Sequence, residues 1–312
     1  MNGSPLIAVL GPTGSGKSDL AIALAERFQG EILNCDSVQV YRHFDIGTAK
    51  ISLPERRHIP HHLLDFVDPD ELFTAGDYAR LGRTILTAVT ARNRLPIVCG
   101  GTGFYLRALL DGLFEGPGRD EQLRHRLLMR EAARPGSMHR LLTRLDPHSA
   151  ARIHSNDSTK LLRALEVRLL TRRPISTLFE QGREALHGYR TLKIGLNPPR
   201  QQLYERLDAR CDRMFASPGI LEEVQSILAM GFPSNAKPFT SIGYVQALSV
   251  LNGESTTEHA IEEARKQTRR YAKRQWTWFR RETELNWLDG FGAGDTVQQR
   301  AFELVADFLA RS

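Results

Sequence analysis

Residues 6–18 read LIAVLGPTGSGKS, an apolar run followed by a glycine-rich loop. The pattern Gly-x-x-x-x-Gly-Lys-Ser between a strand and a helix is typical of a phosphate-binding loop, in which backbone N–H groups at a helix N-terminus attract phosphate oxygens. The context fits, because LIAVL has strand composition and residues 17–28 carry apolar side chains at helical spacing. The stretch predicts a strand, a phosphate loop and a helix, but it does not say which molecule carries the phosphate.

Each part of this loop has an expected role. The glycines permit the backbone conformations that the loop needs, Lys17 reaches terminal phosphates, and the Ser18 hydroxyl is the expected Mg²⁺ contact. The expected phosphate-binding residues are Gly11, Pro12, Thr13, Gly14, Ser15, Gly16, Lys17 and Ser18.

The rest of the chain predicts an α/β protein with an insertion. Strand candidates at 31–35 and 95–101 alternate with a helix at 76–93, which favours a parallel sheet with helices on both faces. Residues 119–173 hold thirteen Lys or Arg against six Asp or Glu and have helical periodicity, and strand composition returns at 191–197. Further helices are expected at 199–216, 219–230, 256–282 and 297–311, with a strand at 285–289. We expect a phosphate-loop core at 1–113, an inserted all-helical domain at 114–189, and the rest of the core at 190–312.

Composition excludes several classes of protein. No run approaches eighteen apolar residues, so no membrane span is expected, and the N-terminus reads as a strand without a signal peptide. The three cysteines lie far apart, which is typical of reduced core thiols in a cytoplasmic protein. The neighbouring His61 and His62 lack a third ligand at zinc spacing, so no zinc site is expected.

The positive charge is concentrated in one segment. Residues 265–281 contain eight Lys or Arg and no acid, whereas the rest of the chain is formally −2. Such a surface is expected to meet a polyanion. The same segment carries aromatic residues that could stack on unpaired bases, but a helical stripe predicts that they pack mainly against the core while the basic face contacts nucleic acid. The stripe comprises Ile261, Ala264, Thr268, Tyr271, Ala272, Gln275 and Trp278 or Phe279.

Two further strand ends are expected beside the phosphate loop. The strand at 95–101 runs into Gly-Gly-Thr-Gly with no acid, although a nucleoside triphosphatase usually has one there to hold metal and order water. The acid follows the strand at 31–35 instead, as Asp36, and ligands bind at the carboxyl ends of parallel strands. Asp36 is therefore a candidate proton acceptor, with a turn or capping role as the alternative. Thr102 fits a site residue and a helix cap equally well.

Several motifs together resemble a known family. GPTGSGKS, DSVQVYRHFDIGTAK at 36–50, HHLLD at 61–65, GGTGFYLRAL at 100–109, RALEV at 163–167, SIGY at 241–244 and TRRYAKRQWTWFR at 268–280 are similar to the bacterial tRNA dimethylallyltransferases. The motifs run in order through nearly the whole chain. Ser18 stands where Thr is common in that family, and Cys99 where Val is frequent; neither departure puts the activity in doubt.

The resemblance implies a reaction and a set of residues. The family transfers a dimethylallyl group from dimethylallyl diphosphate to N6 of the adenosine immediately 3′ of the tRNA anticodon, with Mg²⁺, and releases diphosphate. It implies diphosphate on the phosphate loop and a general base at Asp36, with Lys17 and Thr102 also catalytic; Arg210 is a further candidate for the diphosphate. The implied tRNA contacts are Asp36, Ser37, Val38, Gln39, Thr102, Arg124, Lys160, Leu161, Leu162, Arg163, Ala164, Ser241, Ile242, Gly243, Tyr244, Arg269, Arg270, Lys273 and Arg274. The protein is expected to be a monomer.

Three alternatives stay open on sequence grounds. One is an isopentenyltransferase for free adenine nucleotides, although such a substrate needs no extended basic surface. The second is an ATP-dependent small-molecule kinase. The third is an RNA-binding module whose loop merely holds a nucleotide.

Overall fold

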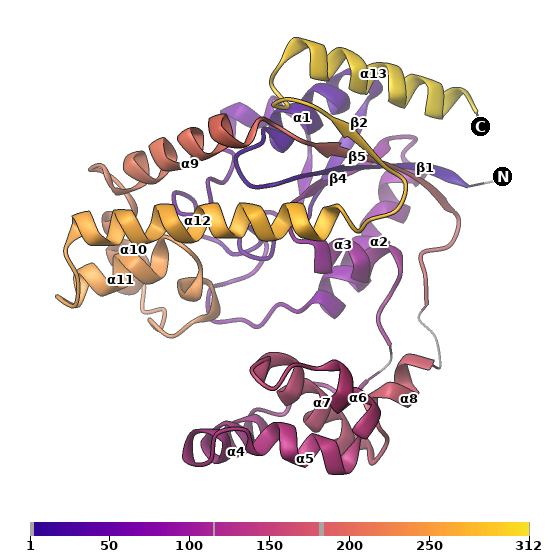
Figure 1. Ribbon diagram of the computed structural model, residues 1–312. Helices are drawn as coiled ribbons and strands as arrows, with labels where there is room; N and C mark the ends of the chain where they lie inside the picture. Colours follow the sequence, from indigo (N-terminus) through magenta and orange to yellow (C-terminus); the bar gives the residue numbers. More distant parts are fainter. Residues whose placement is uncertain (1–2, 115, 181–183, 312) are drawn as a thin grey trace. The chain divides into compact units, whose positions relative to one another are not determined.

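The computed structural model describes residues 3–114, 116–180 and 184–311. Contacts within the chain define two units, one formed by residues 1–110 with 186–312 and the other by residues 111–185 (Figure 1). The insertion expected at 114–189 thus differs from the second unit by a few residues at each end. At the second boundary, Leu186 already belongs to the first unit, where its amide donates to the Leu110 carbonyl oxygen at 2.7 Å.

The first unit is built on a six-stranded parallel sheet, as the sequence predicts. The strand order is β3-β2-β4-β1-β5-β6. The strands are β1 (Ser4–Leu10), β2 (Gly30–Asn34), β3 (His61–His62), β4 (Leu95–Gly100), β5 (Tyr189–Leu196) and β6 (Leu285–Leu288). β1 is central and pairs with β4 on one side and β5 on the other. Because both faces of the sheet are covered, the two central strands are buried and apolar from Leu6 to Leu10 in β1 and from Leu95 to Gly100 in β4. The two-residue strand β3 was not predicted.

Helices cover the two faces of this sheet. α1 (Lys17–Phe28) and α13 (Asp295–Ala310) pack on one face, where Val9, Leu24, Ile97 and Ala301 belong to one buried cluster. α2 (Ala75–Ala91) and α3 (Gly103–Leu110) lie on the other face (Figure 1). The observed fold confirms the predicted phosphate-loop type of α/β architecture.

The remaining helices of the first unit follow β5. They are α9 (Arg200–Phe215), α10 (Ile220–Ala229), α11 (Tyr244–Leu251) and α12 (Thr257–Phe279), with short 3₁₀ turns η1 at Pro54–Arg56 and η2 at Lys237–Thr240. α12 packs along α9 and α11, and its C-terminal part reaches α3. The predicted stripe on α12 is correct at five of its positions, since Ala264, Thr268, Ala272, Gln275 and Phe279 are buried. Ile261, Tyr271 and Trp278 are only half-buried, and the fully packed tryptophan is Trp276.

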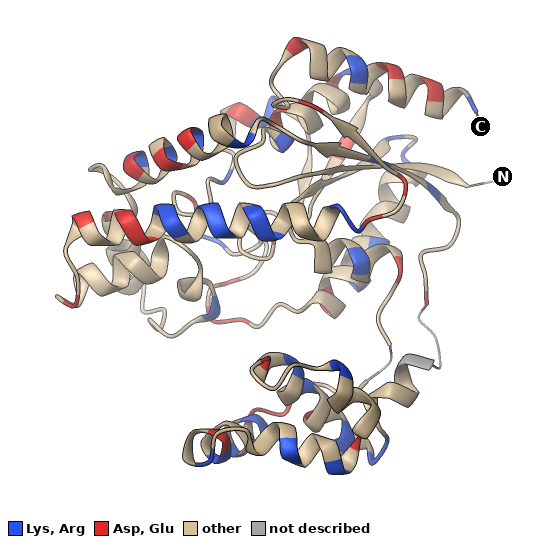
Figure 2. Cartoon of the chain, in the orientation of Figure 1, with Lys and Arg blue, Asp and Glu red and all other residues tan. Residues whose placement is uncertain are grey.

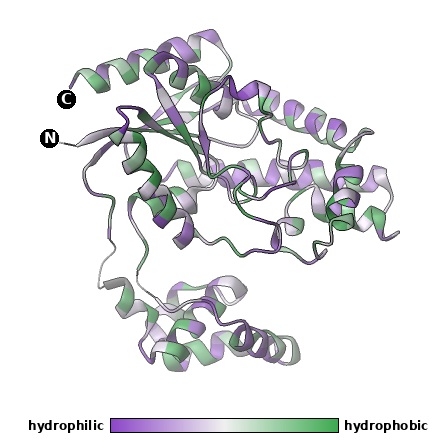
Figure 3. Ribbon diagram, turned by 180° about the vertical axis from the view of Figure 1, so that it is seen from behind, coloured by the Kyte–Doolittle hydropathy of each residue, from purple (hydrophilic) through white to green (hydrophobic). Residues whose placement is uncertain are grey.

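The second unit is helical in its described residues. It contains α4 (Glu121–Ala133), α5 (Ser137–Leu145), α6 (Pro147–Arg152), α7 (Ser158–Thr171) and α8 (Ile175–Glu180). Asp120, Asp146 and Asp157 cap the N-termini of α4, α6 and α7, accepting hydrogen bonds from backbone amides that have no partner within the helix. The helices of both units carry hydrophobic and hydrophilic residues in alternation, as amphipathic helices do (Figure 3). The unit has its own apolar core, which includes Leu142, Leu161 and Leu165.

No helix in the described part of the chain is long and apolar enough to cross a membrane.

Candidate active site

Three neighbouring strands end at one edge of the sheet, and their ends form the site. β4 lies between β1 and β2, with Leu10 opposite Gly100 and Asn34 opposite Cys99. The phosphate loop after β1, Asp36 after β2 and the Gly101–Thr102 turn after β4 are therefore adjacent. This is the edge at which open parallel sheets bind ligands.

The phosphate loop is held in a conformation that requires glycine. Gly16 has a φ of 84° and immediately precedes α1. A Cβ on Gly16 would lie 2.9 Å from the Gly292 amide nitrogen, and one on Gly14, where φ is 78°, would lie 2.7 Å from Leu207 Cδ2. Gly292, between β6 and α13, also donates its N–H to the Ser15 carbonyl oxygen at 2.9 Å. Segments far away in the sequence thus fix the shape of the loop.

Lys17 and Arg210 bring positive charge to this loop. Lys17 Nζ donates to the Pro12 carbonyl oxygen at 2.8 Å. Burial lowers the pKa of Lys17 to about 8, although the charge of Asp36 opposes this effect. Arg210, on α9, donates from Nη1 to Thr13 Oγ1 at 3.1 Å, and its Nε is buried without a partner among the described residues. Burial also lowers the pKa of Arg210. Two desolvated cations beside helix N–H groups form a strong anion site.

Asp36 lies in the turn that follows β2. Its Oδ1 accepts hydrogen bonds from the amides of Val38 and Gln39 at 2.8 and 3.2 Å. These bonds give Asp36 the turn-forming role that the sequence left open, and they hold the half-buried carboxylate in place. Asp36, Gln39 and the phosphate loop line the same pocket. The turn role and the proposed chemical role are therefore compatible.

Thr102 binds the same turn instead of capping a helix with its side chain. Its Oγ1 accepts a hydrogen bond from the Ser37 amide at 3.1 Å, and its own amide donates to the Cys35 carbonyl oxygen at 3.1 Å. Its backbone carbonyl, not its hydroxyl, accepts from the first turn of α3. The side chain therefore joins the end of β4 to the turn that carries Asp36.

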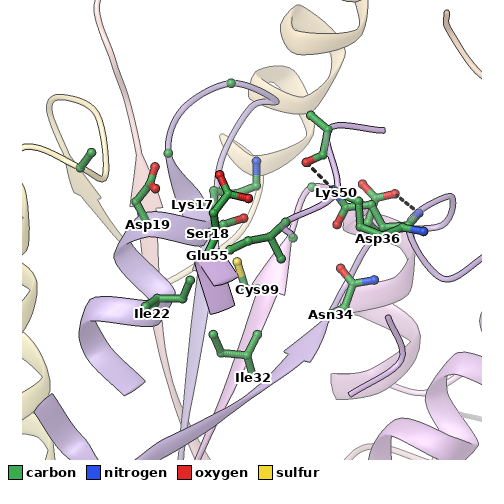
Figure 4. Close-up of a pocket in the computed structure, with 18 of the residues that line it drawn as sticks. Lys17, Ser18, Asp19, Ile22, Ile32, Asn34, Asp36, Lys50, Glu55 and Cys99 are labelled. Atoms are coloured by element: carbon green, nitrogen blue, oxygen red, sulfur yellow. Dashed lines mark hydrogen bonds between the residues drawn. The ribbon is translucent and has the colours of Figure 1, made fainter. Parts of the chain in front are cut away.

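The pocket enclosed by these groups has a volume of about 1090 Å³. Figure 4 shows Lys17 and Ser18 in its middle, with Asp36 and Asn34 to one side and Asp19 to the other. Ile22, Ile32 and Cys99 add apolar surface. The pocket thus offers cations and amides for a diphosphate, an acid at one side, and apolar surface for a short hydrocarbon.

The basic segment of α12 divides into paired and unpaired cations. Arg265 pairs with Asp212, and Arg269 pairs with both carboxylate oxygens of Asp208, at 2.8 and 2.6 Å, so α9 neutralises these two side chains. Figure 2 shows Lys and Arg on successive turns of α12. In the part of the chain that the structure describes, the exposed Arg270, Lys273 and Arg274 have no acid within ion-pair distance. These three side chains form the open basic face of α12.

Several residues of the second unit that are expected to contact tRNA have buried side chains. The side chains of Leu161, Leu162 and Ala164 are at most 7% exposed and belong to the core of that unit. α7 turns these side chains inward, and contact of residues 160–164 with tRNA stays a prediction. Among the residues expected at 160–164, Lys160 presents an exposed side chain, which pairs with Asp157.

Arg124 and Arg163 also have a structural role. Arg124 donates to both oxygens of the buried Glu166 at 2.6 and 2.9 Å, and Arg163 donates to Glu166 at 2.6 Å and to the Pro117 carbonyl oxygen at 3.0 Å. Burial opposes the charge of Glu166, but hydrogen bonds from Arg124, the Asp120 amide and Arg163 outweigh it and lower the pKa of Glu166 to about 2. Arg124 therefore has a structural partner in Glu166, and its contact with tRNA stays a prediction.

The SIGY segment lies at the junction between a loop and α11, and Tyr244 faces inward. Its side chain is fully buried, and its hydroxyl donates to Glu223 and accepts from the Gly47 amide at 3.0 Å. Glu223 also accepts from the amides of Asp45 and Ile46. Tyr244 therefore holds the 45–47 loop, and its contact with tRNA stays a prediction. Ser241 and Ile242 are partly exposed, and Gly243 has a φ of 95° before α11.

The histidines and cysteines have ordinary structural surroundings. His61 Nδ1 bonds the Ile59 carbonyl oxygen at 2.8 Å, and His62 Nε2 lies 2.7 Å from Glu31. Cys35, Cys99 and Cys211 are free and buried. Burial raises the pKa values of the Cys35 and Cys99 thiols to about 12.

Two residues near the site had no assigned role at the sequence level. Lys50 is almost fully buried and donates to the Tyr41 carbonyl oxygen and to Asp65, at 2.7 and 2.6 Å, so it ties down the loop that follows Asp36. The only sequence feature that could have pointed to Lys50 was its place at the end of the DIGTAK motif. Gln275 appeared only as part of an apolar stripe, yet it contacts two of the three strand ends.

A parallel sheet, a phosphate loop and a desolvated cation pair define a phosphate-loop protein with an anion pocket at the strand ends. The model of the IPP transferase family matches residues 39–282, and the chain belongs to this family. It is 62% identical over 307 residues, 98% of this chain and 100% of the relative, to the tRNA dimethylallyltransferase of Solibacter usitatus (strain Ellin6076). It is 52% identical to that of Koribacter versatilis (strain Ellin345), covering 96% of this chain and 97% of the relative.

Solved structures of proteins named as tRNA-modifying transferases have a similar fold. The crystal structure of a tRNA isopentenylpyrophosphate transferase from Bacillus halodurans has a TM-score of 0.73 and 35% identity, over 99% of this chain and 97% of that one. A eukaryotic dimethylallyltransferase acting on tRNA gives a TM-score of 0.83 at 30% identity, over 99% of this chain and 80% of that one.

Proposed function

We propose that this chain transfers the dimethylallyl group from dimethylallyl diphosphate to N6 of the adenosine immediately 3′ of the tRNA anticodon and releases diphosphate. One observation carries this proposal. The phosphate loop, with its desolvated Lys17, shares a pocket with Asp36 after β2, while the turn after β4 consists of Gly101 and Thr102 and carries no acid. Such a pocket suits a diphosphate that leaves and a nucleophile that loses a proton. The names of the relatives point to the same reaction.

The reaction forms one bond and breaks another. The N6 nitrogen attacks C1 of the allylic chain, and the C1–O bond breaks with its electron pair passing to the diphosphate. The proton lost from N6 is accepted by Asp36, because an exocyclic amine is a weak nucleophile that gains from a nearby base. Val38 and Gln39 amides hold the Asp36 carboxylate, so it needs no reorganisation as the reaction proceeds.

The phosphate loop stabilises the charge that gathers on the diphosphate. Lys17, Arg210 and the first-turn amides of α1 supply fixed positive charge in a partly desolvated site, where electrostatic stabilisation is strongest. The unpartnered Arg210 Nε is a donor that a phosphate oxygen would satisfy. The diphosphate is the leaving group here, so the loop needs no acid to activate water.

Mg²⁺ fits this site in one particular way. Within the described ranges, no cluster of three or more His, Cys, Asp or Glu could hold a metal by itself. The Ser18 hydroxyl lines the pocket, and Mg²⁺ commonly binds few protein ligands together with substrate phosphates and water. We therefore assign Ser18 as the protein contact. Bound Mg²⁺ would neutralise diphosphate charge.

The tRNA is proposed to meet the open basic face of α12 and the exposed cations of the second unit. Arg270, Lys273 and Arg274 provide charges for phosphates, and Lys160 with exposed arginines of the second unit provides others. A base within a stacked loop cannot reach Asp36, so the adenosine is expected to leave its stack at a cost of a few kcal/mol. Because its substrate is tRNA, we assign the protein to the cytoplasm.

One assay with four arms tests the proposal. The protein is incubated with radiolabelled dimethylallyl diphosphate or γ-labelled ATP, each with tRNA or AMP as acceptor. Label from dimethylallyl diphosphate in tRNA, with AMP unlabelled, supports the proposal. Label in AMP alone would indicate a free-nucleotide transferase, and label only from ATP would indicate a kinase. Either result would overturn it.

A further inference from the structure

Gln275 lies on α12 where that helix passes the strand ends of the site. Its side chain is 5% exposed and belongs to the buried face of the helix. The neighbouring buried positions on this face carry Ala272, Trp276 and Phe279. A polar amide among them loses its hydration, so it is stable only where both of its ends have partners.

Both ends of the Gln275 amide are used, and by two different segments. Oε1 accepts a hydrogen bond from the Thr13 amide of the phosphate loop at 2.7 Å. Nε2 donates to the Gly101 carbonyl oxygen at 2.9 Å, in the turn after β4. A backbone N–H on one side and a carbonyl on the other fix the orientation of the amide. One side chain therefore bridges the end of β1 and the end of β4.

The close approach of the Gly101 turn strengthens this bridge. A Cβ on Gly101 would lie 2.2 Å from Gln275 Nε2, so the backbone here leaves no room for a side chain. Two neighbouring residues of α12 hold the same turn. The Tyr271 hydroxyl interacts with the Thr102 side chain, and a Cβ on Gly103 would lie 2.0 Å from Trp278 Nε1. α12 thus contacts three successive residues of this turn.

The two segments joined by Gln275 serve opposite halves of the reaction. On one side, Thr13 accepts the hydrogen bond from Arg210 in the diphosphate half of the pocket. On the other side, Thr102 holds the Ser37 amide, next to Asp36, in the half that receives the amine. The helix that supplies the bridge also presents Arg270, Lys273 and Arg274 to solvent.

We propose that Gln275 is a positioning residue, which sets the phosphate loop at a fixed distance from the Gly101–Thr102 turn and thereby sets the diphosphate relative to Asp36. This inference rests on the proposed function. Loss of the two Gln275 hydrogen bonds should weaken diphosphate binding and slow the transfer step, because a displacement of about 1 Å can lower the rate a hundredfold. The same change should not alter the solvent-exposed face of α12, so the affinity for tRNA should stay the same.

Two variants and a control separate positioning from a general packing role. Gln275→Met keeps the length of the side chain and removes both hydrogen bonds. Gln275→Glu keeps the acceptor for Thr13 but, when ionised, faces the Gly101 carbonyl without a proton to donate. The control is Gln267→Met, on the same helix about two turns earlier and half-buried. All are assayed as full-length protein at 20 °C, after circular dichroism has shown them folded.

The readouts are kcat, KM for dimethylallyl diphosphate, the inhibition constant of inorganic diphosphate, and the Kd for tRNA. For Gln275→Met we expect at least a tenfold loss in kcat/KM and a several-fold weaker diphosphate inhibition, with tRNA Kd within twofold of wild type. For Gln275→Glu, protonation restores a donor, and burial raises the pKa of the introduced carboxyl. Its kcat/KM relative to wild type should therefore rise as pH falls from 8.5 to 6.

The contrary results are equally clear. Wild-type kinetics in both Gln275 variants, or an equal loss in Gln267→Met, would overturn the positioning role. So would a parallel loss of tRNA and diphosphate affinity, which indicates general damage to α12. If Gln275→Met does not fold, a flat pH ratio for Gln275→Glu still refutes the inference. If wild type does not prenylate tRNA, the proposed function fails first, and the two failures are thereby distinguished.

Discussion

Replacing Asp36 by Asn removes the proposed base while it preserves the turn around it. Asp36 Oδ1 accepts hydrogen bonds from the Val38 and Gln39 amides at 2.8 and 3.2 Å. The Asn side chain carries an oxygen in the same position, so it can accept both bonds. The amide nitrogen replaces the other carboxylate oxygen and cannot take a proton from N6. The substitution therefore separates the chemical role of residue 36 from its structural role.

The two roles predict effects of very different size. General base catalysis contributes about 10²–10⁴-fold, which corresponds to about 3–5 kcal/mol in the activation free energy. Hydrogen bonds to a charged acceptor exceed those to a neutral one by about 1 kcal/mol, so the turn is weakened only slightly. We expect kcat to fall by at least a hundredfold, while the thermal midpoint and the Kd for tRNA change little.

Single-turnover kinetics measures this most directly, because product release does not enter. Enzyme in excess over tRNA is mixed with saturating labelled dimethylallyl diphosphate, and tRNA affinity is measured in parallel by filter binding. A transfer rate within threefold of wild type would remove Asp36 from the mechanism. A loss of tRNA affinity that accounts for the whole loss in rate would give Asp36 a binding role only.

Three further predictions concern the loop, the fold and the RNA surface. Burial lowers the pKa of Lys17 to about 8, so the free enzyme loses this charge as the pH rises through 8. Calorimetry in buffers of different ionisation enthalpy should therefore show proton uptake when diphosphate binds at pH 9, and the absence of uptake would contradict the lowered pKa. Gly47→Ala places a Cβ 2.2 Å from Tyr244 Cε2 and should lower the free energy of unfolding by about 1–3 kcal/mol. Urea titrations measure this change, and an unchanged midpoint would refute the close approach of these two residues. Charge reversal at Arg270 and Lys273 should weaken tRNA binding and reduce the slope of log K against log salt by about 0.9 for each phosphate that is no longer neutralised, whereas an unchanged slope would exclude this face.

The sequence predicted the fold because backbone conformation and burial leave local patterns in the residue types. The loop at 11–18 has glycines at the positions that adopt positive φ, and the strand before it is apolar on both faces because both faces are covered. Asp36 and the Gly101–Thr102 turn could be placed beside the loop because carboxyl ends of parallel strands share an edge. β3 was missed because a two-residue strand has no periodicity to detect.

Side-chain direction was the part that the sequence could not supply. A motif match indicates that a segment lies near a substrate, but it does not say which side chain faces it. Tyr244 lies in a matching motif and Leu161 among the expected tRNA contacts, yet both side chains face inward, where burial of their apolar surface stabilises the fold. Arg124 and Arg269 look like RNA contacts by composition, but each pairs with an acid distant in sequence. Only the tertiary fold brings these partners together.

The position of the modified nucleotide tests the central claim most directly. An unmodified tRNA with adenosine 3′ of the anticodon is incubated with the protein, dimethylallyl diphosphate and Mg²⁺, then digested and analysed by mass spectrometry. The account predicts one N6-dimethylallyladenosine at that position and one diphosphate released per tRNA, with no product when the adenosine is replaced by guanosine. An unmodified adenosine, or a dimethylallyl group elsewhere in the tRNA, would contradict it.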